Sequence, residues 1–224
     1  SGKQSLEFGN EQEYLNMLGE PFPAGVVACL IPAPKKLIIC LKQLSPLKEN
    51  EEMEIAHELG HVYLIYNNYQ CLQRDPDSSR REAIDILFSP LFDIVQHAIF
   101  YPWLKLKYNL DLYNEGNQRL YDFSKTDLPK AKINLEGDQV SLILSYLKYN
   151  IEADDRYWLY RLHKAYSKPN FVGLKGTAER VLPIIQELAR NPLDAQFFLE
   201  KYYEILQAMN INREIWPDFV IKNC

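Results

Sequence analysis

The sequence has few of the residues that mark the more specialised classes of protein. It contains four cysteines, and no two of them form a Cys-x-x-Cys pair. Small secreted proteins that are held together by disulfides have more cysteines for their length, so we expect no disulfide framework. The first residues also lack the apolar core of a signal peptide, so we do not expect secretion. A reducing, cytoplasmic location fits these features best.

Long basic runs and uninterrupted hydrophobic runs are absent as well. The net charge is -5, which argues against a protein that binds nucleic acid directly. The longest apolar stretch, residues 84–104, contains two aspartates, two prolines, Gln96 and His97. Because charged and polar groups are costly inside a bilayer, we interpret this stretch as a buried helix of a soluble protein and expect no contact with a membrane.

The remaining composition is that of an ordinary globular protein. The chain has 224 residues, of which 47% are hydrophobic and 25% are charged, and this length allows one sizeable core. Two short apolar runs, at residues 26–31 and 37–41, flank a Pro-rich turn and predict a β-hairpin. Helical periodicity is found in the following stretches: 6–18, 51–66, 139–151, 154–167, 177–190 and 193–209.

These patterns predict an α+β fold. We expect a core at residues 1–108, a linker or long crossover at 109–137 and an all-helical subdomain at 138–224, packed together as one compact unit. Residues 216–220 are expected to form a short strand or a packed tail.

Two of the four histidines lie in a single motif. His57 and His61 flank Glu58 in the pattern His-Glu-x-x-His, and on a helix the two histidines project from one face about one turn apart. Two imidazoles at this spacing can bind a divalent metal, and zinc suits such ligands. Glu58 is then placed to act as general base toward water rather than as a ligand. The motif therefore predicts a catalytic zinc site.

A third ligand has to come from another part of the chain. Turn-forming residues at 75–79 predict that a second helix begins near residue 79 or 80 and runs back past the first. Glu82 lies at the start of this helix, and its carboxylate would complete a set of two histidines and one glutamate with one position left open. Asp85, about one turn later, could accept a hydrogen bond from a ligating histidine.

Two later residues of the second helix are alternatives. Asp93 and His97 are four residues apart, and either could be the third ligand if a later turn of the helix reaches the metal. His97 could instead stabilise an oxyanion. We expect His163 to be structural or to lie on the surface. Gly60, inside the motif helix, costs about 1 kcal/mol relative to alanine, and the close approach of a strand or a ligand would explain it.

The order of these features resembles the gluzincin metallopeptidases. Within that group the chain is most similar to the ImmA/IrrE family of small bacterial regulatory proteases, over residues 26–90. The residues that carry the resemblance are the apolar run at 37–39, Ile-Ala-His-Glu-Leu-Gly-His at 55–61 and Arg-Glu-Ala at 81–83.

This resemblance implies a zincin-like fold and a soluble enzyme that cleaves a repressor-type protein. It also implies a zinc site formed by His57, His61 and Glu82, with Glu58 as the base. We therefore expect a zinc metallopeptidase that hydrolyses a peptide bond in a protein partner, and an edge strand near residues 37–41 could hold the substrate extended. One alternative is a metal-containing protein-binding or sensor module without proteolytic activity. Another is a toxin or immunity component, and no oligomeric state is predicted.

Overall fold

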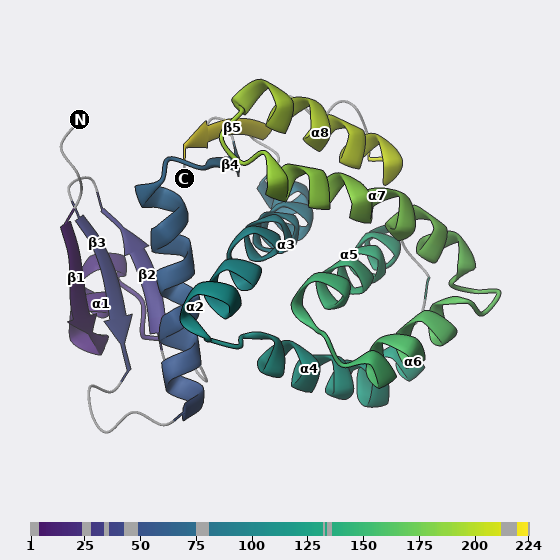
Figure 1. The fold of residues 1–224 in the computed structure, drawn as a ribbon, viewed down its shortest axis with the longest axis horizontal. Coiled ribbons are helices and arrows are strands. Elements are labelled where there is room, and N and C mark those ends of the chain that lie inside the picture. Colours follow the sequence, from purple (N-terminus) through teal and green to yellow (C-terminus); the bar gives the residue numbers. More distant parts are fainter. Residues whose placement is uncertain are drawn as a thin grey trace.

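The computed structural model describes residues 5–23, 28–33, 36–42, 49–74, 81–131, 133, 136–211 and 219–223. The fold is α+β and mostly helical, as expected from the sequence. A small sheet lies at one side, helix α2 covers one of its faces, and the remaining long helices pack on the far side of α2 (Figure 1).

The three-stranded sheet contains the predicted hairpin. Strands β2 (Ala28–Pro32) and β3 (Lys36–Leu41) are antiparallel, and β1 (Ser5–Asn10) pairs with β3 in parallel, which gives the order β1-β3-β2. Strand β3 is therefore central, so the expectation that residues 37–41 form a substrate-binding edge was wrong. Among the described strands of this sheet, β2 is the edge nearest to the motif helix (Figure 1).

The first predicted helix begins later than expected. Residues 5–10 form β1, and helix α1 spans Glu11–Leu18. Asn10 separates the two, because its side chain accepts hydrogen bonds from the N–H groups of Gln12 and Glu13 while the Glu13 side chain accepts one from the Asn10 N–H. The predicted end at Gly19 is confirmed, since this residue has the left-handed conformation (φ 72°) of a helix C-cap.

The motif lies on helix α2 (Glu49–Tyr66), which packs against helix α3 (Arg81–Tyr108). One face of α2 buries Val62 against the sheet. On the opposite face, a Cβ atom at Gly60 would overlap the ring of Phe100 on α3. The absence of a side chain at Gly60 thus allows the two helices to approach closely. The close neighbour that requires glycine here is a side chain of α3, and not a strand or a ligand as we expected. Helix α3 continues through both of its prolines.

The C-terminal half is helical, as the periodicity predicted. The four predicted helices are present as α5 (Glu136–Glu152), α6 (Arg156–Tyr166), α7 (Val172–Arg190) and α8 (Ala195–Ala208). Side chains of α5, α7 and α8 share the largest hydrophobic core with the middle of α3. This shared core brings the end of α5 next to the helix pair that carries the motif.

The stretch at 109–137, which we expected to be a linker or long crossover, is helical over much of its described part. It contains helix α4 (Tyr113–Asp122), a π-helical turn η1 (Phe123–Asp127) and a 3₁₀ turn η2 (Leu128–Lys130). Periodicity did not reveal α4 because most of its side chains are polar. Gly116 anchors it, since a Cβ atom there would overlap the main-chain carbonyl of Glu152.

The structure also contains a second sheet, of two strands, and the sequence predicted only one of them. Strand β4 (Gln70–Arg74), which follows α2, pairs antiparallel with β5 (Phe219–Asn223). The strand alternative for the C-terminal region is thus confirmed near residue 220, whereas β4 was missed. Cys71 on β4 takes part in a disulfide bond, contrary to the expectation of reduced cysteines. In the described part of the chain, no helix has the length and apolar character needed to span a membrane.

Candidate metal centre

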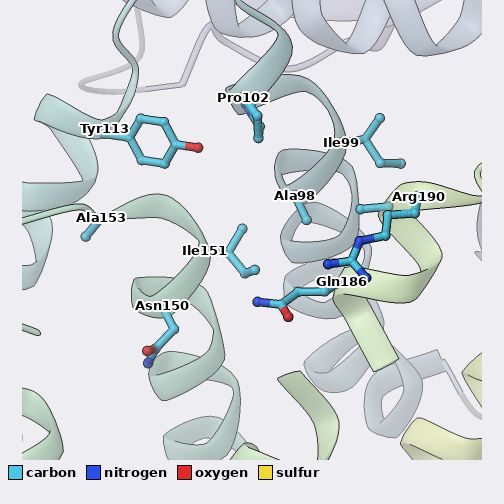
Figure 2. Close-up of a pocket in the computed structure, with 10 residues that line it drawn as sticks. Ala98, Ile99, Pro102, Tyr113, Asn150, Ile151, Ala153, Gln186 and Arg190 are labelled. Atoms are coloured by element: carbon cyan, nitrogen blue, oxygen red, sulfur yellow. The ribbon is translucent and has the colours of Figure 1, made fainter. Parts of the chain in front are cut away.

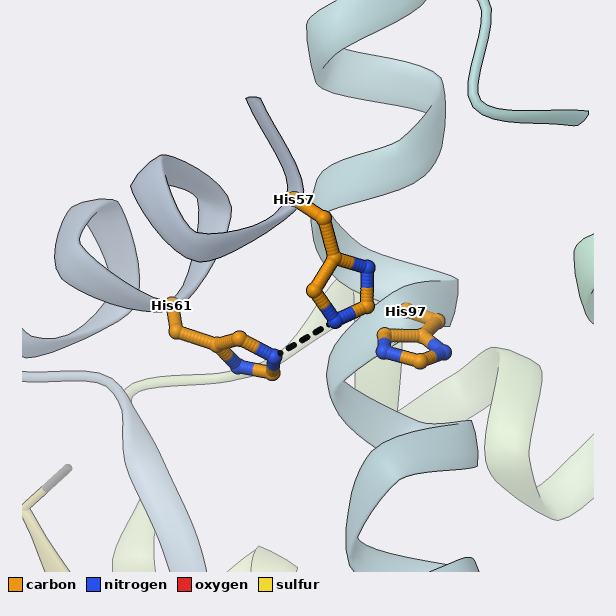
Figure 3. A group of neighbouring side chains, drawn as sticks. All are labelled: His57, His61 and His97. Atoms are coloured by element: carbon orange, nitrogen blue, oxygen red, sulfur yellow. Dashed lines mark hydrogen bonds between the residues drawn. The ribbon is translucent and has the colours of Figure 1, made fainter. Parts of the chain in front are cut away.

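Three histidines from two helices meet between α2 and α3 (Figure 3). His57 and His61 lie one turn apart on α2, and His97 reaches them from α3. One ligand nitrogen from each ring lies within 4.8 Å of the other two. In the motif itself, 3.1 Å separates Nε2 of His57 from Nε2 of His61. This convergence makes the cluster a candidate metal centre.

The other nitrogen of His61 is held by an amide. Its Nδ1 lies 2.5 Å from Oε1 of Gln96, and the Nε2 of Gln96 donates to the sulfur of Cys71 over 3.0 Å. Because an amide oxygen only accepts hydrogen bonds, Nδ1 of His61 must be the donor. The lone pair of this ring is therefore on Nε2, which is the nitrogen that faces His57.

His97 is held in the same way by a carboxylate. Its Nδ1 lies 2.6 Å from Oε1 of Glu152, at the end of α5. The Nε2 of His97 is buried and has no hydrogen-bond partner among the described residues. In His57, Nδ1 lies 3.4 Å from the hydroxyl of Tyr101. Each ring thus has a neighbour at Nδ1, which leaves Nε2 available as a metal ligand.

Burial keeps the three rings neutral, which metal binding requires. Burial lowers the pKa of His61 to about 4 and holds the pKa values of His57 and His97 well below their ordinary range. The hydrogen bond that His61 donates to Gln96 opposes this shift only partly. A neutral imidazole offers its lone pair to a cation without first losing a proton.

The spacing of the nitrogens suits a tetrahedral ion. Zinc bound at about 2.0 Å from each nitrogen would hold the ligand atoms about 3.3 Å apart. The 3.1 Å between His57 and His61 is already close to this value, so a side-chain adjustment at His97 would complete the set. The buried, unpartnered Nε2 of His97 and the three-imidazole donor set therefore fit a zinc ion.

Glu58 lies in the same cleft and is fixed to the sheet. Its Oε2 accepts a hydrogen bond of 3.0 Å from the main-chain N–H of Leu30 on β2. Burial raises the pKa of Glu58 to about 7. The hydrogen bond from the Leu30 N–H lowers this pKa, and the charge of Asp93 raises it. A carboxyl group with a pKa near neutrality can both accept and release a proton at physiological pH.

The cleft itself has a volume of about 240 Å³ and is highly polar. It is lined from five elements by Ala28, Glu54, His57, Glu58, Asp93, His97, Glu115, Arg119 and Lys148. Glu115 forms an ion pair with Arg119, one turn along α4. Helix α4, which lies in the expected linker, thus forms part of the wall of the metal cleft.

The sequence-predicted site residues have different outcomes. His57, Glu58 and His61 lie together, and the alternative ligand His97 joins them. Asp93 lines the cleft but does not belong to the cluster. The side chains of Glu82 and Asp85 are outside the described residues, so their roles stay predictions.

Helix geometry makes Glu82 and His97 competing choices. Residues 82 and 97 belong to the same helix, α3, and fifteen residues of helix span about 22 Å along the axis. A single ion that is bound by His97 would therefore be far from the main chain of Glu82.

His163 has the structural role that we expected. One of its nitrogens lies 3.1 Å from the hydroxyl of Tyr146, and the other lies 3.1 Å from the side-chain oxygen of Asn150.

Two other cavities have a different character. One, of about 460 Å³, lies between α3, α5 and α7 and is lined largely by apolar side chains, with Arg190 and Gln186 at its edge (Figure 2). It contains none of the clustered histidines. The other, of about 680 Å³, runs between α2 and α4 and shares Glu54 and Glu115 with the metal cleft. This second cavity therefore adjoins the metal cleft.

Glu152 was not anticipated from the sequence. It is a single acid near the end of a mainly apolar helix, and no spacing relates it to the motif.

The chain matches no family model, no curated protein and no solved structure. The candidate centre is therefore supported by its residues and their geometry alone.

Proposed function

We propose that this chain is a zinc-dependent metallopeptidase with His57, His61 and His97 as ligands and Glu58 as general base. The observation that carries the proposal is the convergence of three neutral imidazoles, two of which, His57 and His97, line one cleft together with the motif glutamate. Three imidazoles with an open fourth position are a ligand set found in catalytic zinc sites. When bound, the ion would supply Lewis acidity that activates water and polarises a carbonyl group.

Glu58 performs the proton transfers in this proposal. With a pKa raised to about 7 by burial, its carboxylate can take a proton from water and later deliver it to the leaving amine. The hydrogen bond from the Leu30 N–H holds one oxygen of Glu58 and leaves the other oxygen for this task. Arg119 and Lys148 are the cations that line the cleft and can balance the charge of the carboxylates there.

The shape of the site favours an extended peptide as the substrate. The cleft of about 240 Å³ holds little more than one or two side chains, but it adjoins the cavity of about 680 Å³ between α2 and α4 and shares two lining residues with it. Strand β2 forms the wall of the cleft at Ala28 and is an edge strand in the described sheet. A substrate chain could pair with this edge through main-chain hydrogen bonds.

The wider assignment to gluzincin-type, ImmA/IrrE-like regulatory proteases is also a proposal. The hairpin followed by the motif helix supports a zincin-like arrangement. A third ligand His97 would depart from the histidine–histidine–glutamate set that defines gluzincins. Cleavage of a repressor-type protein, without direct contact with nucleic acid or membrane, remains part of this proposal. The disulfide at Cys71 argues against a reducing location.

The test is the substitution Glu58→Gln in the zinc-loaded protein. Its substrates should be unfolded casein and a mixed peptide library, because the natural partner is not identified. Loss of the general base should reduce hydrolysis by about 100-fold or more, while the zinc content stays at one ion per chain. Unchanged hydrolysis would show that Glu58 is not the base.

A second result separates the proposal from its main alternative. If the wild type binds one zinc ion tightly but cleaves neither casein nor any library peptide, the metal serves a protein-binding or sensor module. The variant His163→Asn is a suitable control, because it removes a histidine outside the cluster and should change neither zinc content nor hydrolysis.

A further inference from the structure

We propose that Glu152 is the positioning residue that holds His97 as the third ligand. The proposal rests on the metal centre described above and extends it to helix α5. Glu152 and His97 are almost completely inaccessible, with exposed fractions of 0% and 3%, and 2.6 Å separates Oε1 of Glu152 from Nδ1 of His97. This contact turns the opposite nitrogen of His97, Nε2, toward the motif histidines.

The unpartnered Nε2 of His97 argues against a purely structural ion pair. If the ring were protonated to pair with Glu152, Nε2 would carry a buried N–H donor without an acceptor among the described residues. If the ring is neutral, Nε2 carries a buried lone pair instead. Both states leave a desolvated polar atom, which costs free energy unless a further group binds it. A cation shared with His57 and His61 supplies that group.

The position of Glu152 is fixed by its surroundings. Its main-chain carbonyl packs against Gly116 on α4, where no side chain could be accommodated. The second carboxylate oxygen, Oε2, lies 3.8 Å from the ammonium group of Lys148, one turn earlier on α5. With its backbone in contact with α4 and its charge near a cation, Glu152 has little freedom to move away from His97.

Glu152 differs in charge from the other Nδ1 partners of the cluster. Gln96 at His61 and Tyr101 at His57 are uncharged groups, whereas Glu152 can offer a full negative charge to His97. A carboxylate that accepts from the distal N–H fixes the tautomer of a ligating histidine and increases the basicity of the ring. The anionic partner, Glu152, thus contacts His97, the proposed ligand that lies outside the motif. Only tertiary structure can orient this ligand.

The experiment measures metal binding rather than activity. Metal-free wild type, Glu152→Gln and Glu152→Ala are titrated with Co²⁺, whose visible absorption reports ligand number and geometry, and with Zn²⁺ in competition against a chromogenic chelator. We expect Glu152→Gln to weaken Zn²⁺ binding by about 10-fold and Glu152→Ala by up to about 100-fold, with a lower Co²⁺ absorption in both. Glu152→Gln should weaken binding less than Glu152→Ala, because glutamine keeps an acceptor oxygen and loses only the charge.

Two further variants serve as controls. Glu187→Gln makes the same chemical change at an exposed glutamate that pairs with Lys201, and it should bind both ions like the wild type. Gly116→Ala leaves the carboxyl group intact but displaces the backbone of Glu152, so we expect weaker binding here too. Circular dichroism of each metal-free variant checks that it is folded, and Glu152→Gln is the variant least expected to disturb folding.

The outcomes separate this inference from the proposed function. If Glu152→Gln and Glu152→Ala bind Co²⁺ and Zn²⁺ with wild-type affinity and spectra, while His97→Ala loses metal, Glu152 has no positioning role. If His97→Ala binds as tightly as the wild type, the ligand set itself is wrong and both ideas fail. Graded loss in the Glu152 variants together with loss in His97→Ala supports the inference.

Discussion

Nε2 of His57 faces Nε2 of His61 across 3.1 Å, although both rings are neutral and at most one of these nitrogens can donate a proton. The distance is close to the separation of two ligands on a single tetrahedral ion. The two rings therefore have the relative placement that a bound cation would require.

Metal removal should destabilise the protein. A cation that binds only the folded state adds about 4 kcal/mol at a concentration 1,000 times its Kd, which corresponds to roughly 10 °C in Tm for a chain of this size. Differential scanning calorimetry before and after treatment with a chelator measures the change. A Tm that is unaffected by both chelation and readdition of zinc would argue against a metal centre in the fold.

The identity of the third ligand should follow from two variants. We expect His97→Ala to weaken zinc binding by more than about 100-fold, which exceeds the effect of losing an outer hydrogen-bond partner. Glu82→Ala should keep wild-type affinity, because residues 82 and 97 are separated by about 22 Å along α3. Isothermal titration calorimetry of both variants decides the question, and the reverse pattern would restore the ligand set of the gluzincins.

Gly60→Ala should destabilise the protein despite the higher helix propensity of alanine. The new methyl group would overlap the ring of Phe100, and overpacking of this kind costs about 1–3 kcal/mol, against a gain of about 1 kcal/mol from propensity. Urea unfolding of the metal-free protein measures the net loss. In the matched control Gly173→Ala, on α7, the methyl group meets nothing within 4 Å, so stability should rise slightly. A similar rise for Gly60→Ala would contradict the close packing of α2 on α3.

Asp93 should make the metal-free protein less stable as the pH rises from about 4 to about 6. Burial raises the pKa of Asp93 from 3.8 to about 6, although Lys148 opposes the shift. The folded state therefore holds the proton more tightly than the unfolded state, and folding stability is lost as that proton leaves. The cost above pH 6 is about 3 kcal/mol, since one pKa unit corresponds to about 1.4 kcal/mol.

The variant Asp93→Asn isolates this effect. It should be more stable than the wild type at pH 7 and similar at pH 4, and the difference between the two proteins cancels the contributions of other acids. Chemical unfolding at several pH values provides the measurement. A difference that does not change between pH 4 and pH 7 would show that Asp93 titrates normally.

Local patterns predicted much of the fold. The motif helix and the four C-terminal helices have a periodicity that reports which face is buried, and the hairpin at β2 and β3 is marked by two short apolar runs around a turn. Strand β4 was missed because its partner β5 is far away in the sequence, so no local signal marks the pair. Helix α4 was missed because its segment is mostly polar and is anchored by tertiary contacts, such as Gly116 against the Glu152 carbonyl and Asn117 against the main chain of Asp154.

The site was predictable to the extent that it is local. The motif placed His57, Glu58 and His61 on one helix, where spacing alone brings their side chains together. The choice between Glu82 and His97 depends on which turn of α3 crosses α2, and tertiary packing such as that of Phe100 against Gly60 determines this crossing. Glu152 carries no sequence signal at all, because its role depends on the docking of α5.

The hydrogen bond between Gln96 and Cys71 has a consequence that reaches beyond the metal cleft. A disulfide sulfur has no proton to donate, so it can only accept from the amide nitrogen of Gln96. The amide is therefore prevented from turning round, and its oxygen must face His61. A reduced thiol can also donate, which would allow the amide to flip and present N–H groups to the ring. The tautomer of His61, a proposed metal ligand, thus depends on the oxidation state of a cysteine on a neighbouring strand.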